Sequence, residues 1–217
     1  MGYYAAFLDL GDKPCLVVGG GAAATEKAQQ LLDAGASVTV LWTSFDPGLQ
    51  ELGDAGRVRL LQRELEEADL QGCCLVIDAS GDDDSGARVA AAARRHSVLV
   101  NVLDRPALCD FIAPALVRRG PLQVAISTAG RSPFLAAHLR RLLEGVVGPE
   151  WGELVELTGR LRDRLRRNGV PLEDQNRIYR RIPDSGALEL LRSGRHADAE
   201  AAVNAGAGES QPSLPLG

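Results

Sequence analysis

The 217-residue sequence has little of several features that mark specialised classes of protein. It contains only 4 cysteines, with no C-x-x-C pair and no histidine at zinc-ligand spacing, which excludes a disulfide framework and a zinc cage. The three histidines, His96, His138 and His196, share no ligand spacing either, so we expect no stable metal site. No apolar run reaches the length of a membrane-spanning helix. The first residues, MGYYAAFLDLGDKP, lack the pattern of a secretory signal, and we expect a cytoplasmic protein.

The overall amino-acid composition is that of an ordinary globular protein, but the charged residues are unevenly distributed along the chain. Residues 1–113 hold 9 Lys and Arg against 17 Asp and Glu, whereas residues 114–195 hold 15 against 9. The basic segment suits an anionic partner such as nucleic acid, phosphate or a carboxylate-rich small molecule, and solvated arginines on helices are the alternative. The arginines of residues 160–167 spread around a helix without an aromatic stacking platform, which argues against nucleic acid.

Short β-branched runs alternate with Ala- and Leu-rich stretches at helical spacing over the first 126 residues. This pattern predicts an α/β protein with a Rossmann-like, doubly wound parallel sheet covered by helices. The predicted strands are Cys15–Val18, Ser37–Leu41, Val58–Leu61, Leu75–Ala79, Val98–Val102 and Leu122–Ser127. The predicted helices are Ala24–Ala34, Ser85–His96 and Pro133–Val147. Pro114 argues against a central strand in residues 111–117, which we interpret as an edge or crossover piece.

From Pro149 the sequence changes to an all-helical pattern. Leucines recur on one face of a predicted helix over Trp151–Arg167, and shorter helices are predicted at Leu172–Arg181 and Gly186–Leu191. The last residues, 196–217, are rich in Ala, Gly, Ser and Pro, and beyond a frayed helix we expect them to be disordered.

The segment CLVVGGGAAATEKAQQLL joins a predicted strand to a predicted helix through the pattern G-x-G-x-x-A. Gly19 permits a tight turn, Gly21 lets the backbone approach a pyrophosphate, and Ala24 keeps the helix close to the strand. With Ala22 and Ala23, the start of the helix presents backbone amides to the phosphates. The strand–turn–helix context favours nucleotide binding over a merely structural turn.

The carboxylate that commonly binds the adenosine ribose, about 20 residues beyond the glycines, is missing. Leu41-Trp42-Thr43-Ser44 stands there instead, so the hydroxyls of Thr43 and Ser44 are the candidate ribose ligands. This stretch has no Arg or Lys for a 2′-phosphate, and we favour NAD over NADP. Ser80, in the turn after the fourth predicted strand, is a second candidate cofactor contact, and a polar loop that caps the next helix is the alternative.

Asp104 follows the predicted strand Val98–Val102, at the sheet edge where open parallel sheets bind ligands. A residue that merely starts a turn is the alternative. The sequence NVLDRPALCDFIAPALVRRGPLQVAISTAGRSPFLAAHLRRLLE resembles the motif N-V-x-D-x-P…F-I-x-P-A…R-G-P-L-x-V-A-I-S-T-x-G-x-S-P of the precorrin-2 dehydrogenase and sirohydrochlorin ferrochelatase family. That family includes the N-terminal module of siroheme synthases and stand-alone enzymes, and the resemblance extends over residues 3–165.

The resemblance implies NAD-dependent oxidation of the tetrapyrrole precorrin-2 to sirohydrochlorin, for siroheme or cobalamin synthesis, with Asp104 as general base. It also implies a homodimer formed through the region after the sheet. The implied substrate contacts are Asn101, Ser127, Thr128, Arg131 and Ser132. The last four would form an anion cradle for a polycarboxylate, and a plain strand–helix connector is the alternative. Ala129 departs from the family pattern, which has glycine there.

Two other functions stay open: a bifunctional enzyme that also inserts ferrous iron into sirohydrochlorin, and a non-catalytic NAD-sensing module. We divide the chain into an NAD-binding Rossmann domain at residues 1–113, a dimerisation and substrate segment at 114–148, a small helical domain at 149–195 and a disordered tail at 196–217.

Overall fold

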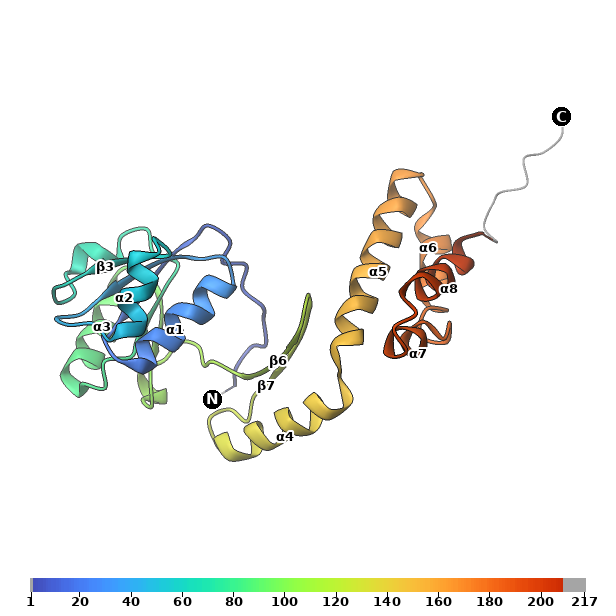
Figure 1. The fold of residues 1–217 in the computed structure, drawn as a ribbon. Helices are drawn as coiled ribbons and strands as arrows, with labels where there is room; N and C mark the ends of the chain where they lie inside the picture. The colour runs from blue at the N-terminus through green and yellow to red at the C-terminus, as the bar shows by residue number, and fades with distance from the viewer. Residues whose placement is uncertain (1, 209–217) are drawn as a thin grey trace. The chain divides into compact units, whose positions relative to one another are not determined.

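The computed structural model describes residues 2–208, which form two compact units. Of the described residues, 2–113 belong to the first unit and 114–208 to the second (Figure 1). Over the described residues, no helix combines the length and the apolar character needed to cross a membrane.

The first unit is built on a five-stranded parallel sheet with the strand order β3-β2-β1-β4-β5. This order confirms the predicted Rossmann-like fold, in which the direction of winding changes between β1 and β4. Val18, Asp78 and Val102 pair across the last positions of β1, β4 and β5, so these three strands end level at one edge. The strands are β1 (Pro14–Val18), β2 (Ser37–Leu41), β3 (Val58–Leu61), β4 (Leu75–Asp78) and β5 (Leu99–Val102).

Helices cover both faces of this sheet, because successive residues of a buried parallel strand point to opposite sides. On one face, Val17 packs with Ala24 and Ala28 of α1 (Ala22–Asp33), and α2 (Pro47–Asp54) adds Leu49 to the same core. On the other face, Val18 packs with residues of α3 (Asp83–Arg95). Two single-turn helices, η1 (Glu67–Leu70) and η2 (Pro106–Leu108), complete the unit.

The second unit begins with a β-hairpin formed by β6 (Ala115–Arg119) and β7 (Leu122–Ile126). The prediction that residues 122–127 belong to the parallel sheet is wrong, because β7 pairs antiparallel with β6 in a separate two-stranded sheet. Only Gly120 and Pro121 separate the strands, and so short a connection allows an antiparallel pair but no parallel crossover. β6 begins directly after Pro114 and lies in a two-stranded sheet, so residues 111–117 contain no central strand, as predicted.

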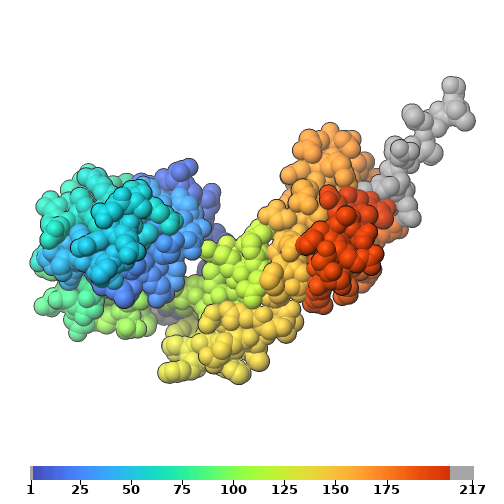
Figure 2. Space-filling view, in the orientation of Figure 1, coloured from blue at the N-terminus to red at the C-terminus, as the bar shows by residue number. Residues whose placement is uncertain are grey.

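The helices of the second unit match the predicted pattern up to α7. Leu154, Leu157, Leu161 and Leu165 form the buried face of α5 and pack against the short helices that follow, so α5 to α8 form one closely packed group (Figure 2). The helices are α4 (Pro133–Val146), α5 (Pro149–Arg167), α6 (Leu172–Tyr179), α7 (Ala187–Arg192) and α8 (His196–Gly208).

For residues 196–217 the sequence predicted disorder beyond a frayed helix; residues 196–208 instead form a 13-residue helix, α8, so the prediction of a disordered segment is wrong there. Ala199 and Val203, one helical turn apart, are both buried in the core of the helical group. The high alanine content of residues 196–208 also favours a helix, and the prediction of disorder from composition gave this preference too little weight. The prediction for residues 209–217 lies outside the described residues.

Candidate functional site

The first two glycines of the loop after β1 hold it against its neighbours. Gly19 has a φ of +140°, and a Cβ added there would lie 2.7 Å from the carbonyl of Ala79. A Cβ added to Gly20 would lie 1.8 Å from the carbonyl oxygen of Ser44, and the Gly20 carbonyl accepts a hydrogen bond of 2.7 Å from the Asp46 amide. Both positions therefore require glycine for packing within the protein.

Gly21 differs, because a Cβ added there would meet nothing within 4 Å. It occupies the N-cap of α1 with an extended backbone (φ −103°), and the first turn of α1 has neither a side-chain cap nor an acidic residue. The amides at the start of α1, from Ala22 onward, therefore face open space, where the helix dipole favours an anion. Ala24 is fully buried against the sheet, the role predicted from the sequence.

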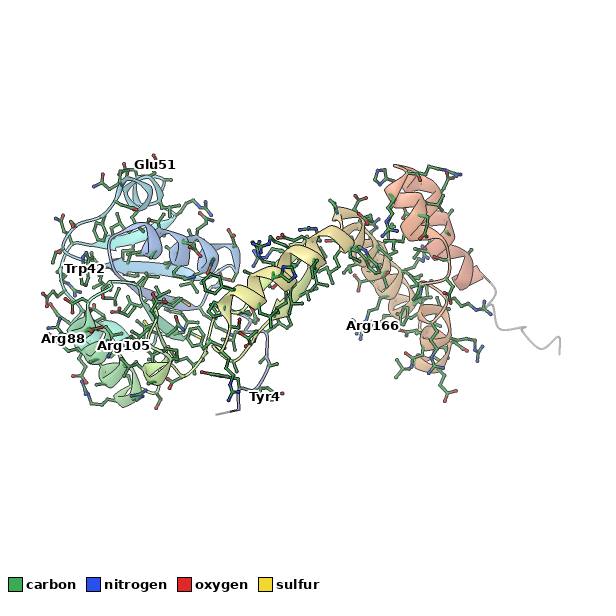
Figure 3. The ribbon with its side chains drawn as sticks, turned by 90° about the horizontal axis from the view of Figure 1, so that it is seen from below. Tyr4, Trp42, Glu51, Arg88, Arg105 and Arg166 are labelled. Atoms are coloured by element: carbon green, nitrogen blue, oxygen red, sulfur yellow. The ribbon has the colours of Figure 1, made fainter. Side chains whose placement is uncertain are left out.

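A cleft of about 430 Å³ lies over the ends of β1, β4 and β5. Its walls are the start of α1 (residues 21–23), the loop after β4 (residues 78–83) and the turn after β5 (residues 102–105). In Figure 3, Arg105 marks this turn, well separated from Glu51 on α2. The cleft lies at the switch point of the sheet, where open α/β sheets bind their ligands.

Four aspartates line the cleft, and three of them have structural partners. Asp82 caps α3 by accepting a 2.7 Å hydrogen bond from the Ser85 amide, and Asp83 is paired with Arg105. The third, Asp78, is buried and accepts hydrogen bonds from Ser80 and Ser85.

Burial raises the pKa of the Asp78 carboxyl, because an ionised group loses hydration there, and the hydrogen bonds from Ser80 and Ser85 oppose this rise only in part. Within residues 2–208, the fourth aspartate, Asp104, has an exposed carboxylate with no hydrogen-bond or ion-pair partner. It is therefore the cleft carboxylate available for chemistry.

Asp104 is held in a conformation that few residues other than glycine adopt. Its φ is +60°, and the turn around it is closed by a 3.1 Å hydrogen bond from the Arg105 amide to the Val102 carbonyl. A left-handed backbone costs most residues with a side chain roughly 1 kcal/mol, and aspartate tolerates it better than most. The turn therefore places the carboxylate at the cleft at a modest backbone cost.

The predicted ribose ligands lie where the sequence places them, directly after β2. Thr43 and Ser44 are both exposed. Asp46, the nearest acid, is occupied elsewhere: it caps α2 and accepts a 2.8 Å hydrogen bond from the Thr25 hydroxyl. Ser80 lines the cleft, but its hydroxyl is already hydrogen-bonded to Asp78 and to the Asp82 amide.

Sequence reasoning missed a second hollow, a groove of about 330 Å³ on the α3 side of the loop. Trp42 lies at its wall, and its Cδ1 atom would be 2.7 Å from a Cβ added to Gly20, so the indole touches the glycine loop. Figure 3 shows Trp42 and Arg88 at the same end of the unit as Arg105. The sequence signal that could have indicated this groove is the aromatic residue Trp42 directly after β2.

The arginines near this groove are matched by carboxylates. Arg63 forms a bidentate pair with Asp69 at 2.7 Å, and this partner lowers the pKa of the Asp69 carboxyl. The other two pairs are Arg95 with Glu67 at 2.7 Å and Arg88 with Glu64 at 3.8 Å.

The predicted substrate contacts are divided between the units. Asn101, in the first unit, is buried and donates a 2.9 Å hydrogen bond to the Phe111 carbonyl, so its amide supports the backbone next to the Asp104 turn. The other four lie in the loop between β7 and α4 in the second unit: Ser127, Thr128, Arg131 and Ser132.

The hydroxyls of that loop shape its backbone. Ser127 accepts a hydrogen bond from the Ala129 amide, Thr128 from the Ser132 amide, and Ser132 caps α4 through the Leu135 amide. Ala129 has a φ of +52°, the left-handed conformation for which glycine is better suited. The departure from the family motif at this position therefore carries a backbone cost.

A parallel sheet of this order with a glycine loop at its switch point defines a dinucleotide-binding Rossmann domain. The family described as "Putative NAD(P)-binding" matches residues 6–115, and the chain belongs to this family. A second family, described as "Sirohaem biosynthesis protein central", matches residues 119–145. These matches confirm the family resemblance seen in the motifs.

Siroheme synthases are among the curated proteins similar to this chain. The protein from Methylococcus capsulatus is 44% identical over 200 residues, which are 92% of this chain and 42% of the relative. The protein from Escherichia coli is 37% identical over 182 residues, 84% of this chain and 40% of the relative. The chain thus spans less than half the length of these relatives.

A solved structure of SirC, described as a precorrin-2 dehydrogenase, has the same fold. The TM-score is 0.74 at 24% sequence identity, and the match covers 94% of this chain and 100% of SirC.

Proposed function

We propose that this chain is an NAD-dependent precorrin-2 dehydrogenase that produces sirohydrochlorin in siroheme synthesis. The observation that carries the proposal is the cleft at the switch point, which combines uncapped helix amides with one carboxylate that has no partner among the described residues. The similarity to siroheme synthases and the shared fold with SirC support this choice of reaction.

The chain offers a consistent set of contacts for the dinucleotide. The amides at the start of α1 hold the pyrophosphate beside Gly21, where no protein atom would obstruct it, and Thr43 and Ser44 bind the adenosine ribose. When bound, NAD supplies a hydride acceptor. Residues 41–46 contain no cation and the nearby arginines are paired with acids, which favours NAD over NADP.

Asp104 acts as the general base in this proposal. Oxidation removes a hydride and a proton from the substrate, and the exposed Asp104 carboxylate accepts the proton. Its position at the end of β5 lines the same cleft as the start of α1, so one cleft serves both transfers.

The second unit supplies contacts to the carboxylates of the substrate. In our proposal the exposed guanidinium of Arg131 and the start of α4 bind these anions, consistent with the basic balance of residues 114–195. One face of α4 exposes apolar residues at helical spacing, namely Leu135, Leu139, Leu142 and Val146. We propose that a second copy of the chain covers this stripe in a cytoplasmic homodimer.

The decisive experiment incubates the protein with precorrin-2 and NAD under anaerobic conditions and follows the absorption of sirohydrochlorin. We expect turnover by the wild type and a large loss in Asp104→Ala. Glu51→Gln, which removes an exposed carboxylate far from the cleft, is the matched control and keeps full activity. NAD binding without any turnover would refute the enzyme and favour an NAD-sensing module.

A second arm of the same experiment adds ferrous iron as a substrate. The relatives are named for siroheme, the iron chelate, so formation of siroheme would extend the proposal to a bifunctional enzyme. Accumulation of sirohydrochlorin alone would restrict it to the dehydrogenase.

A further inference from the structure

The chain beyond the Asp104 turn folds back along β5. After η2, the Asp110 amide donates a 2.8 Å hydrogen bond to the Val100 carbonyl, and the Asp110 carboxylate accepts one of 3.2 Å from the Val100 amide. This return covers the free side of an edge strand and brings Cys109 beside Val102, the last residue of β5.

The Cys109 thiol contacts both ends of the turn that carries Asp104. Its sulfur lies 3.2 Å from the Val102 amide nitrogen, 3.2 Å from the Val102 carbonyl oxygen and 3.3 Å from the Arg105 carbonyl oxygen. A thiol has one proton and weak acceptor capacity, so it accepts from the Val102 amide and donates to one of the two carbonyls at a time. A single side chain thereby joins the first and last residues of the turn.

Backbone hydrogen bonds also hold the turn: besides the bond that closes it, the Leu103 amide donates to the Asp78 carbonyl at 3.0 Å and the Leu108 amide to the Arg105 carbonyl at 2.9 Å. None of these bonds involves Asp104 itself, whose left-handed backbone lies between the two residues that the thiol contacts. Burial raises the pKa of the Cys109 thiol, so the sulfur keeps the proton that it donates.

We propose that Cys109 is a positioning residue for Asp104, whose thiol clamps Val102 to Arg105 and so holds the carboxylate at the cleft. The proposal rests on the proposed role of Asp104 in the dehydrogenase. Without the thiol, the turn can relax and the carboxylate leaves its place, while the dinucleotide contacts at the start of α1 are untouched.

The test compares Cys109→Ala and Cys109→Ser with the control Cys73→Ala. Cys73 is similarly half-buried and also donates its thiol to a carbonyl, that of Asp69 at 3.2 Å, which lies in η1 and not in the Asp104 turn. We expect Cys109→Ala to lower kcat at least about 10-fold, since misplacing a catalytic group by about 1 Å costs up to about 100-fold. Its KM for NAD should stay within about two-fold of the wild-type value. Cys109→Ser should recover most of the kcat, because a hydroxyl can also donate and accept.

The double variant Asp104→Ala/Cys109→Ala tests whether the thiol acts through the carboxylate. We expect it to be no slower than Asp104→Ala alone. A further loss in the double variant, an unchanged kcat in Cys109→Ala, or an equal loss in Cys73→Ala would each overturn the inference.

Amide hydrogen exchange provides a readout that needs no substrate. We expect the Arg105 amide to exchange faster in Cys109→Ala than in the wild type or in Cys73→Ala. If the wild type forms no sirohydrochlorin, the proposed function fails, but faster exchange would still establish that the thiol holds the turn. Unchanged exchange at Arg105 would overturn the inference whatever the activity.

Discussion

Replacing Gly21 or Gly20 by alanine should separate cofactor binding from folding, although the two glycines are adjacent. At Gly21 the new methyl group meets no protein atom within 4 Å, and the φ of −103° suits alanine. Loss of the N-cap preference for glycine costs about 1 kcal/mol or less. In our proposed function, the methyl group instead occupies the space through which a pyrophosphate would reach the amides of α1.

The loss of NAD affinity in Gly21→Ala can be sized from those amides. One charge-assisted hydrogen bond to a phosphate is worth about 1.5–3 kcal/mol. Its removal weakens binding roughly 10- to 100-fold. Gly20→Ala is the contrasting variant, because its methyl group would lie 1.8 Å from the Ser44 carbonyl oxygen, far inside the 3.4 Å of ordinary contact. The loop must move, which costs about 1–3 kcal/mol or more.

Isothermal titration with NAD and chemical denaturation would measure the two effects on the same samples. We expect Gly21→Ala to fold with near wild-type stability and to bind NAD weakly, and Gly20→Ala to be clearly destabilised. Wild-type NAD affinity in a folded Gly21→Ala protein would refute the assignment of the pyrophosphate to the start of α1.

Three further predictions test other parts of the structure. Ala129→Gly should raise the melting temperature of the second unit by about 1–3 °C, because it relieves a φ of +52°, and a lower melting temperature would contradict this. NAD should change the fluorescence of Trp42 beside the glycine loop, so Trp42→Phe should lose the signal that Trp151→Phe keeps, and the reverse result would place the dinucleotide elsewhere. Burial raises the pKa of Asp78, so its stabilising contribution is present below its unfolded pKa of about 4 and is lost as pH rises through the folded pKa. The denaturation midpoint of Asp78→Asn minus that of the wild type should therefore be larger at pH 7 than at pH 4. The same difference at both pH values would refute this.

The strands of the Rossmann unit could be predicted because each is a short apolar run between turn signals. An apolar run predicts a strand but not the strand with which it pairs. The run at Leu122–Ile126 indicated a strand, but the two-residue connection to β6 determines that it pairs antiparallel with β6. The helix α2 was missed because Gly48 and Gly53 lower its helical pattern, although Asp46 and Pro47 form a good start signal, N-cap followed by proline. α8 was expected only as a frayed helix, because the composition of the segment concealed two buried residues one turn apart.

For the site, the sequence identified the residues that follow strand ends, because the parallel topology gathers those ends at one edge. Gly21, Ser80 and Asp104 therefore line one cleft, as expected from that topology. The partners that decide what each group can do were not predictable. The sequence left open a capping role for the loop before α3, and Asp82 fills it, but no sequence pattern pairs Asp83 with Arg105 or places Asp78 against buried hydroxyls. Only these assignments together distinguish Asp104 from its neighbours.

The positive φ at position 104 bears on why aspartate occupies this turn. Four residues other than glycine have positive φ, among those the structure describes: Asp12, Ser97, Asp104 and Ala129. Ser97 has an ordinary explanation, since it follows the C-cap of α3, where a left-handed residue commonly ends a helix. Aspartate tolerates a left-handed backbone better than most residues, and glycine at position 104 would remove the carboxylate from the cleft. The turn therefore combines a backbone that aspartate can adopt with a carboxylate that has no partner among the described residues, which is the combination that our proposed general base requires.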